Sequence, residues 1–146
     1  STPMVVALFD VDALRATNQA LGQGAGDAVL RHVASTLRQA VRSHDVVARI
    51  GGDEFAVIAS GLTLLRANAR LRQMIEAIGD GSMGPGGEPV TVSCGAAEYG
   101  AGDSVPTLLH RADEALREAK THGKGSVAAR SARSNRRTLQ AARYSA

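Results

Sequence analysis

ARIGGDEFAVIAS, residues 48–60, is the stretch that decides the fold. Two apolar runs flank two glycines and two acidic residues, a pattern that predicts a β-hairpin with a glycine turn. Asp53 and Glu54 lie side by side at the tip of this hairpin, where their carboxylates repel each other. Either the tip is an ordinary solvated turn, or the two acids are held there to bind a positively charged group.

The segments around the hairpin alternate between strand and helix patterns. Residues 4–11 are apolar nearly throughout, which predicts a strand that is covered on both faces. Residues 24–41 carry apolar side chains at spacings of three and four, which predicts an amphipathic helix. We expect further elements as follows: strands over 46–50 and 54–60, a helix over 63–78, a glycine-rich loop over 79–89, a strand over 90–99, a helix over 104–123 capped by Ser104, and a short strand over 126–129.

This order of elements, β–α–β–β–α–β–α–β, mixes hairpins with helical crossovers. It predicts an α+β sandwich, in which helices pack on a mostly antiparallel sheet. The 146 residues, of which 44% are hydrophobic, suffice for one domain with its own core. No apolar run approaches the roughly 20 residues that span a bilayer, so no membrane segment is expected. A single cysteine, Cys94, excludes an internal disulfide and favours a reducing, cytoplasmic location.

The net charge of +3 is unevenly distributed along the chain. Residues 1–125 contain 12 basic and 14 acidic side chains, whereas all five charged residues after position 125 are arginines. We therefore expect a domain over 1–128 and a basic tail or linker over 129–146. A solvated linker helix explains the tail better than a nucleic-acid or membrane contact, because no aromatic residues interleave the arginines.

Carboxylates are predicted to converge at one end of the sheet. In a strand, Asp10 and Asp12 point to the same side, and a strand beside the hairpin brings Asp10 to Asp53. Converging carboxylates without a matching basic residue in the motif favour a divalent metal, and oxygen ligands favour Mg²⁺ or Mn²⁺ over zinc. Because Mg²⁺ commonly shares its shell with substrate phosphates, a nucleoside triphosphate is the expected substrate. A plain hairpin turn remains the alternative at this point.

Four motifs resemble the GGDEF family of diguanylate cyclases. RIGGDEFAVI (49–58) resembles the family signature, and the longer stretch 8–55 contains its Asp-x-Asp, Asn, Gly-Asp and Arg-x-x-Asp elements at the family spacing. VTVSCGAAEY (90–99) resembles the T-x-S-x-G strand, and LLHRADEALREAKTHGKG (108–125) resembles the A-D-x-A-L-Y-x-A-K helix. The resemblance covers about residues 4–128. It implies a palm-like fold shared with class III nucleotide cyclases, and the conversion of two GTP into cyclic di-GMP and two pyrophosphates.

The resemblance also implies a role for each acidic residue of the site. Asp10, the backbone carbonyl of Val11 and Asp53 would hold Mg²⁺ (or Mn²⁺) on the triphosphate. Asp53 would also lie near the attacking 3′-hydroxyl, and Glu54 would assist a second metal or its shell. Asp53 and Glu54 are thus the catalytic pair that the resemblance implies.

Nucleotide recognition is implied for a second group of residues. Asn18 and Asp27 would read the guanine edge, since an amide donates and accepts while a carboxylate accepts from the N1–H and 2-amino groups. Each has a structural alternative: Asp27 could favour a helix start and Asn18 could bond its own backbone. The remaining predicted GTP contacts are Ala13, Leu14, Arg15, Gln23, Lys120 and Lys124.

Arg42 and Asp45 match the family's inhibitory site, where cyclic di-GMP would bind. Arginine forks onto guanine or phosphate and the carboxylate accepts from guanine; a surface ion pair is the alternative. Arg70 or Arg72 on the next helix would complete that site. Family positions also differ here: Leu14-Arg15 replaces F-K, Gln19 replaces an aspartate, Gln23 a histidine, Arg117 a tyrosine, and Gly123-Lys124-Gly125 replaces G-R-N.

Three functions are compatible with this sequence. The first is a cyclase that works as a homodimer, because each domain holds one GTP. The second is a non-catalytic module that binds GTP or cyclic di-GMP and regulates a fused domain. The third is a polymerase-like or adenylyl-cyclase-like enzyme that prefers ATP. The sequence lacks the family's N-terminal D-x-L-T-G-L-x-N-R helix, so we expect a longer parent protein with sensor or effector domains.

Overall fold

The computed structural model describes residues 3–81 and 89–132. Five strands and four helices make up this part of the chain. Their order and bounds are β1 (Met4–Val11), α1 (Leu14–Leu21), α2 (Gln23–Ala40), β2 (Val46–Arg49), β3 (Glu54–Ser60), α3 (Leu64–Asp80), β4 (Val92–Glu98), α4 (Val105–Thr121) and β5 (Val127–Arg130).

The strands form one sheet in the order β2-β3-β1-β4-β5. β1 lies in the middle and pairs antiparallel with both β3 and β4, while β5 joins β4 in parallel. β2 and β3 are the two arms of the predicted hairpin, paired antiparallel. The expected α+β fold with a mostly antiparallel sheet is confirmed.

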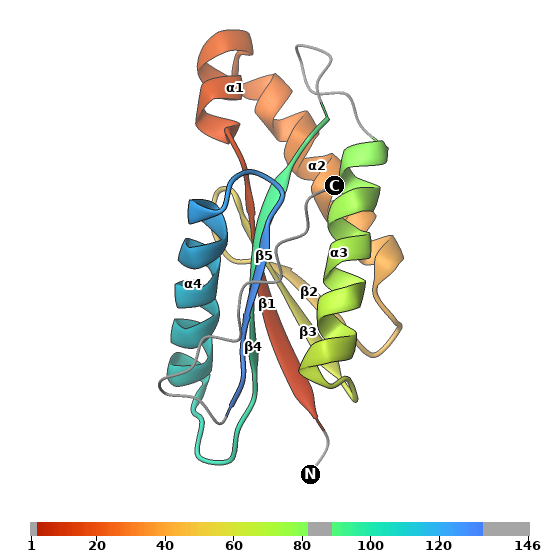
Figure 1. Ribbon diagram of the computed structural model, residues 1–146. Coiled ribbons are helices and arrows are strands. Elements are labelled where there is room, and N and C mark those ends of the chain that lie inside the picture. Colours follow the sequence, from red (N-terminus) through yellow and green to blue (C-terminus); the bar gives the residue numbers. More distant parts are fainter. Residues whose placement is uncertain (1–2, 82–88, 133–146) are drawn as a thin grey trace.

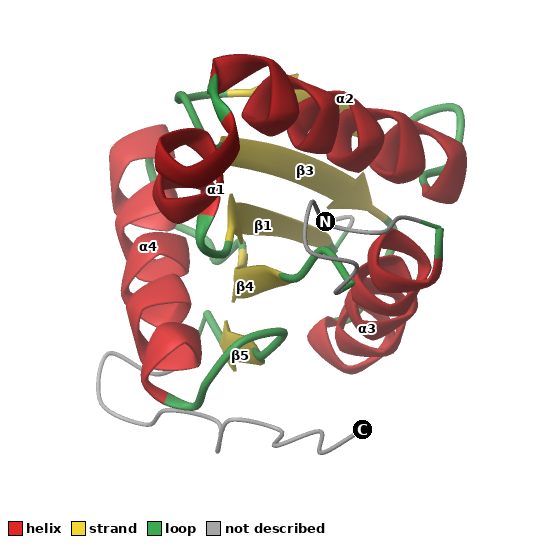
Figure 2. Cartoon of the chain, turned by 90° about the horizontal axis from the view of Figure 1, so that it is seen from above, coloured by secondary structure: helices red, strands yellow, loops and turns green. Residues whose placement is uncertain are grey.

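Helices cover both faces of the sheet, with α4 on one side and α2 and α3 on the other (Figure 2). The strand alternation explains this sandwich, since Val5, Ala7 and Phe9 join the core under α2 and α3. Val6 and Leu8 point the other way, into the core beneath α4. α1 lies above the end of the sheet where β1 ends (Figure 1).

Gly95 lets α4 pack directly on the backbone of β4. A Cβ atom at this position would lie 2.1 Å from the backbone nitrogen of Leu116 and 2.4 Å from the carbonyl oxygen of Ala112. These are backbone atoms of α4, which cannot move aside without moving the helix. The close approach fixes α4, and with it Lys120 near its C-terminus, relative to the sheet.

Two sequence predictions need correction. No element is expected from the sequence between residues 11 and 24, yet the helix α1 lies there. Its only buried side chain is Leu14, so the apolar periodicity that identifies a helix is missing. The helix expected to run to Val41 ends at Ala40, because Val41 is extended, with φ −87° and ψ 157°. The glycine-rich loop falls largely on residues 82–88, and most of the tail on residues 133–146, both outside the described residues.

Candidate active site

The tip of the β2–β3 hairpin is fixed against the end of β1. The Val11 N–H donates to the carbonyl oxygen of Asp53 at 3.0 Å, and Asp10 stands opposite Glu54 in the β1–β3 register. Arg49 holds the two glycines, because its guanidinium donates to the carbonyl oxygens of Gly51 (3.1 Å) and Gly52 (2.7 Å). The prediction that Asp10 and Asp53 meet at one end of the sheet is therefore confirmed.

The Asp10 carboxylate lies between β3 and α4. Its Oδ2 accepts a hydrogen bond from Lys120 Nζ, and its Oδ1 is buried with no hydrogen-bond partner in the described residues. Burial, together with the nearby Asp53, raises the pKa of Asp10 despite the opposing effect of Lys120. Burial opposes ionisation of Lys120 as well, but its bond to Asp10 prevails and raises the pKa of the ammonium.

Glu54 adds a further carboxylate to this cluster. Burial raises its pKa, and the charges of Asp10, Asp113 and Asp53 raise it further. Asp113 comes from α4, as Lys120 does, so that helix contributes both signs of charge. Burial is the largest cause of both raised pKa values, and the neighbouring carboxylates act in the same direction while Lys120 opposes them.

Asp12 has a structural role that the sequence did not indicate. Its carboxylate accepts hydrogen bonds from Thr91 Oγ1 (2.9 Å), from Ser93 Oγ (2.7 Å) and from the N–H of Gly125 (3.2 Å). Asp12 thereby ties the end of β1 to β4 and to the loop that carries Lys124, an exposed side chain. The second acid of the Asp-x-Asp motif is engaged as an anchor for this loop.

A pocket of about 470 Å³ opens beside the hairpin tip, between α1, α2 and the glycine turn. Its volume lies in the range of small-molecule sites. Six of the predicted site residues line it: Leu14, Arg15, Asn18, Gln23, Asp27 and Asp53. Gln19, Leu30, Arg49 and Gly52 also line it, although the sequence analysis gave them no role in binding.

Asn18 points its amide into the seam between α1 and α2. Its Oδ1 is buried and has no hydrogen-bond partner among the described residues. Gly26 makes room for this side chain, since a Cβ atom there would lie 1.8 Å from Asn18 Oδ1. The glycine that precedes Asp27 is therefore required by the packing of Asn18.

The chain enters α1 through a strained residue. Ala13 has φ 58° and ψ 23°, the left-handed conformation that costs a non-glycine residue about 1–2 kcal/mol. Ala13 provides no side-chain cap, so the first N–H groups of α1 lack the acceptor that a Ser or Asp would supply. Arg15, in the first turn of α1, adds a positive side chain at the pocket.

Asp10 and Asp53 suit Mg²⁺ in the type of their donors. No group of three or more His, Cys, Asp or Glu side chains arranged to hold a metal occurs within residues 3–81 and 89–132. Mg²⁺, however, is commonly held by one or two carboxylates together with waters and substrate phosphates. The unpartnered Oδ1 of Asp10 and the raised pKa values of Asp10 and Glu54 fit a cation that arrives with its substrate.

Arg42 and Asp45 form a separate cluster at the opposite end of the hairpin from its tip. Arg42 donates to Asp45 through its backbone N–H (2.9 Å) and guanidinium, and to the carbonyl oxygen of Ser60 at 2.5 Å. Arg70 lies 3.8 Å from Asp45 Oδ2 and donates to Ala40 at 2.9 Å. Although burial opposes it, bonding to Arg42 lowers the pKa of Asp45, whose side chain is only 1% exposed.

The structure thus groups the predicted residues into three places. The nucleotide-sized pocket holds the first group, and the α4 side of the tip holds Asp10, Glu54 and Lys120. Arg42 and Asp45 are remote from both. Of the missed residues, Arg49 is the one that the sequence could have indicated most easily, because it directly precedes the quoted Ile-Gly-Gly motif. Asp12 and Gly26 could be assigned only from three-dimensional contacts.

Curated relatives resemble this chain over most of its length. It is 34% identical over 134 residues to the probable diguanylate cyclase DgcT of Escherichia coli, a match that covers 88% of this chain and 30% of that protein. It is 35% identical over 129 residues to the diguanylate cyclase DosC of the same organism, covering 86% of this chain and 28% of DosC. The chain therefore spans less than a third of either relative.

Solved structures agree in fold. The GGDEF domain of DgcB from Caulobacter crescentus, in complex with c-di-GMP, superposes with a TM-score of 0.81 at 30% identity, covering 88% of this chain and 78% of that one. The GGDEF domain of PA1120 from Pseudomonas aeruginosa superposes with a TM-score of 0.78 at 33% identity, covering 92% of this chain and 84% of that one. No helix in the described part of the chain is long and apolar enough to cross a membrane.

The family model described as "Diguanylate cyclase, GGDEF domain" matches residues 1–126. The match includes the hairpin tip, the pocket between α1 and α2, and Lys120 on α4. On these grounds the chain belongs to the GGDEF domain family of diguanylate cyclases.

Proposed function

We propose that this domain condenses two GTP into cyclic di-GMP with release of two pyrophosphates, in a Mg²⁺-dependent reaction across a homodimer. The observation that carries the proposal is the pocket that joins Asn18 and Asp27 to Asp53 at the hairpin tip. One wall offers amide and carboxylate groups to a base, and the tip offers carboxylates to a metal and a hydroxyl.

Guanine recognition falls to Asn18 and Asp27 in this proposal. The Oδ1 of Asn18 is buried against Gly26 without a hydrogen-bond partner in the described residues, so we expect the amide to turn toward the pocket when it accepts from a base N–H donor. Asp27 is exposed on the same wall of the pocket, and its carboxylate can accept from two adjacent donors. Guanine presents such donors at N1–H and the 2-amino group, whereas adenine has an acceptor at N1. Gln23 borders the same wall from the first turn of α2.

The triphosphate is assigned to the region where β1 ends, α1 begins and α4 ends. The N–H groups at Ala13 and Leu14 and the side chain of Arg15 would bind the terminal phosphates, as helix N-termini bind anions. Lys120 and Lys124 would neutralise further charge. Lys120 is bound to Asp10 without ligand, so we expect it to move partly toward phosphate when nucleotide binds.

Asp10, Asp53 and the Val11 carbonyl are the residues that would hold Mg²⁺, with Glu54 supporting a second ion or its shell. When bound, the metal would offset the charge of the triphosphate and of the attacking oxygen. In this proposal Asp53 accepts the proton of the 3′-hydroxyl, and the bond from the Val11 N–H to its backbone carbonyl holds its main chain at the hairpin tip. The remaining contribution of the chain is positioning of the two reacting groups.

The pocket is sized for one nucleotide, so chemistry requires two domains that face each other. We place product inhibition at Arg42 and Asp45, with Arg70 as the third side chain. Arg42 is the accessible member, at 35% exposure of its side chain, whereas Asp45 would have to release Arg42 to meet a guanine. We expect the domain to act in the cytoplasm, where GTP is available, within a longer signalling protein.

Nucleotide selectivity tests this proposal. In calorimetric titrations with Mg²⁺, GTP should bind at least tenfold more tightly than ATP, and Asp27→Asn should remove most of the difference. Arg66→Ala, which alters an exposed side chain on α3, serves as the control and should keep the preference. A preference for ATP would contradict the proposal and favour the adenylyl-cyclase-like reading.

A further inference from the structure

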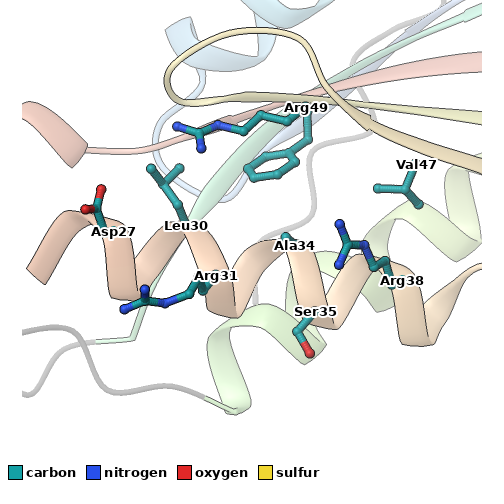
Figure 3. Close-up of a pocket in the computed structure, with 9 residues that line it drawn as sticks. Asp27, Leu30, Arg31, Ala34, Ser35, Arg38, Val47 and Arg49 are labelled. Atoms are coloured by element: carbon teal, nitrogen blue, oxygen red, sulfur yellow. The ribbon is translucent and has the colours of Figure 1, made fainter. Parts of the chain in front are cut away.

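A second groove of about 470 Å³ runs along α2 on its β2 side (Figure 3). It meets the nucleotide pocket at Asp27, Leu30 and Arg49, which line both. Beyond these shared residues it is lined by Arg31, Ala34, Ser35, Arg38, Val47 and Phe55. None of these six has a role in the proposed cyclase reaction.

The rim of this groove is basic. Arg31, Arg38 and Arg49 line it, and the single acid along it is Asp27 at the shared end. Within residues 3–81 and 89–132, the side chains of Arg31 and Arg38 form no hydrogen bond or ion pair, whereas Arg49 is held by the glycine turn. Arg31 and Arg38 are seven positions apart, which separates them by about 10 Å along the helix.

The floor of the groove is apolar. Leu30 and Phe55 are 7% and 2% exposed, and Ala34 and Val47 are half-buried beside them. Two guanidiniums without partners above such a floor suit a ligand that combines phosphate with an aromatic or apolar part. The volume is that of a small-molecule site, which favours a mononucleotide over a polymer.

We propose that this groove is a second binding site for a phosphorylated mononucleotide, distinct from the GTP pocket. Arg31 and Arg38 bind its phosphates, and Leu30, Ala34 and Val47 contact its base or sugar. Ser35, on the same face of α2, supplies a hydroxyl. Figure 3 shows Arg38 reaching toward Val47 across the groove, while Arg31 extends from the end nearer Asp27.

Nuclear magnetic resonance titrations of the whole chain test this site. ADP without Mg²⁺ is the probe, because the GTP pocket is expected to discriminate against adenine. The amides of residues 30–38 and 46–49 should shift saturably, and Arg31→Ala/Arg38→Ala should weaken this binding by roughly tenfold or more. Arg66→Ala removes an exposed arginine from α3 and should leave the affinity for ADP unchanged. Asn18→Ala, which alters only the first pocket, should also leave it unchanged.

Three results would overturn the proposal. One is an unchanged affinity for ADP in the Arg31→Ala/Arg38→Ala variant. Another is a loss of ADP affinity in Arg66→Ala as large as that in the double variant, which would indicate a general charge effect. The third is inorganic pyrophosphate binding as tightly as ADP, since the apolar floor would then contribute nothing. GTP binding in the double variant should stay within about twofold of the original, which shows that the variant is folded and separates this test from that of the proposed cyclase site.

Discussion

Asp53 and Glu54 can stand side by side because the residues around them compensate for the repulsion. Lys120 reaches Asp10 from α4, the Val11 N–H binds the carbonyl of Asp53, and Arg49 holds the glycine carbonyls. Burial, more than any neighbouring charge, raises the pKa values of Asp10 and Glu54. The Oδ1 of Asp10, which is buried without a hydrogen-bond partner in the described residues, is the physical reason to expect a metal at the tip.

Gly26→Ala should weaken GTP binding by roughly tenfold while leaving the fold intact. The added methyl group would lie 1.8 Å from Asn18 Oδ1, so the side chain that we propose to read guanine must move. Alanine itself favours helix by about 1 kcal/mol relative to glycine, so thermal denaturation should reveal little loss of stability. Calorimetric titration with GTP measures the effect.

Gly24→Ala is the matched control for that substitution. It makes the same change in the same helix, at a position where a Cβ atom meets nothing within 4 Å. Its affinity for GTP should equal that of the original protein. Equal affinities in both variants would contradict the positioning role of Gly26.

At the scale of elements, α4 must be locked onto the sheet for Lys120 to reach Asp10. Asp103, just before α4, accepts two guanidinium bonds from Arg111, at 2.5 and 2.7 Å. It also accepts from the N–H of Gly100 and from Thr107 Oγ1, while Arg111 donates to the carbonyl of Glu98 at the end of β4. This cluster fixes the start of the helix that carries Lys120.

Asp103→Asn should lower the free energy of unfolding by roughly 2–3 kcal/mol near pH 7. Bonding to Arg111, and then to Gly100 and Thr107, holds the pKa of Asp103 well below its ordinary value despite burial. A carboxyl whose pKa is depressed in the folded state stabilises it above the unfolded pKa of about 4 and loses that effect as pH falls further. Urea denaturation at several pH values should therefore show the difference between variant and original shrinking below about pH 4.

Glu76→Gln, an exposed acid on α3, is the control and should change the stability little. If the difference in the free energy of unfolding between Asp103→Asn and the original stays constant from pH 7 to pH 3, the depressed pKa of Asp103 does not stabilise the fold and the prediction is contradicted.

Most elements were predictable because their apolar residues repeat at helix or strand spacing. β1 and α2 follow such patterns closely, and they place Asp10 and Asp27. α1 was not predictable in this way, because it buries only Leu14 and depends on Gly22 and Ala13 for its ends. The resemblance to the family identified the pocket residues on α1 even though its helical structure was missed.

Contacts between distant segments limited the prediction of the site. In the sequence Asp12 is only an acid on the same side of the strand as Asp10, and its bonds to Thr91 and Ser93 in the structure reveal an anchor. Likewise, the groove beneath Arg31 and Arg38 forms because β2 lies alongside α2, a juxtaposition that no local pattern indicates.

At the scale of the whole molecule, we propose that two copies of the domain face each other, each with one GTP in its own pocket beside Asp53, and together form the complete cyclase. Of the two nucleotide-sized sites, only the pocket between α1 and α2 is lined by Asp53, so each domain offers one GTP to the catalytic tip. Activity should therefore depend on bringing two domains together, and a fused dimeric coiled coil supplies the required proximity.

The most direct measurement is chromatographic assay of cyclic di-GMP after incubation of the coiled-coil-dimerised domain with GTP and Mg²⁺. The original chain should form the product, and Asp53→Ala should lower the rate at least a thousandfold. Circular dichroism should show that the variant keeps its fold, and Asp80→Ala, an exposed acid at the end of α3, should retain full activity. Product formation by Asp53→Ala at the original rate would contradict the catalytic assignment, and GTP binding without product in the dimerised original would establish a regulatory module instead.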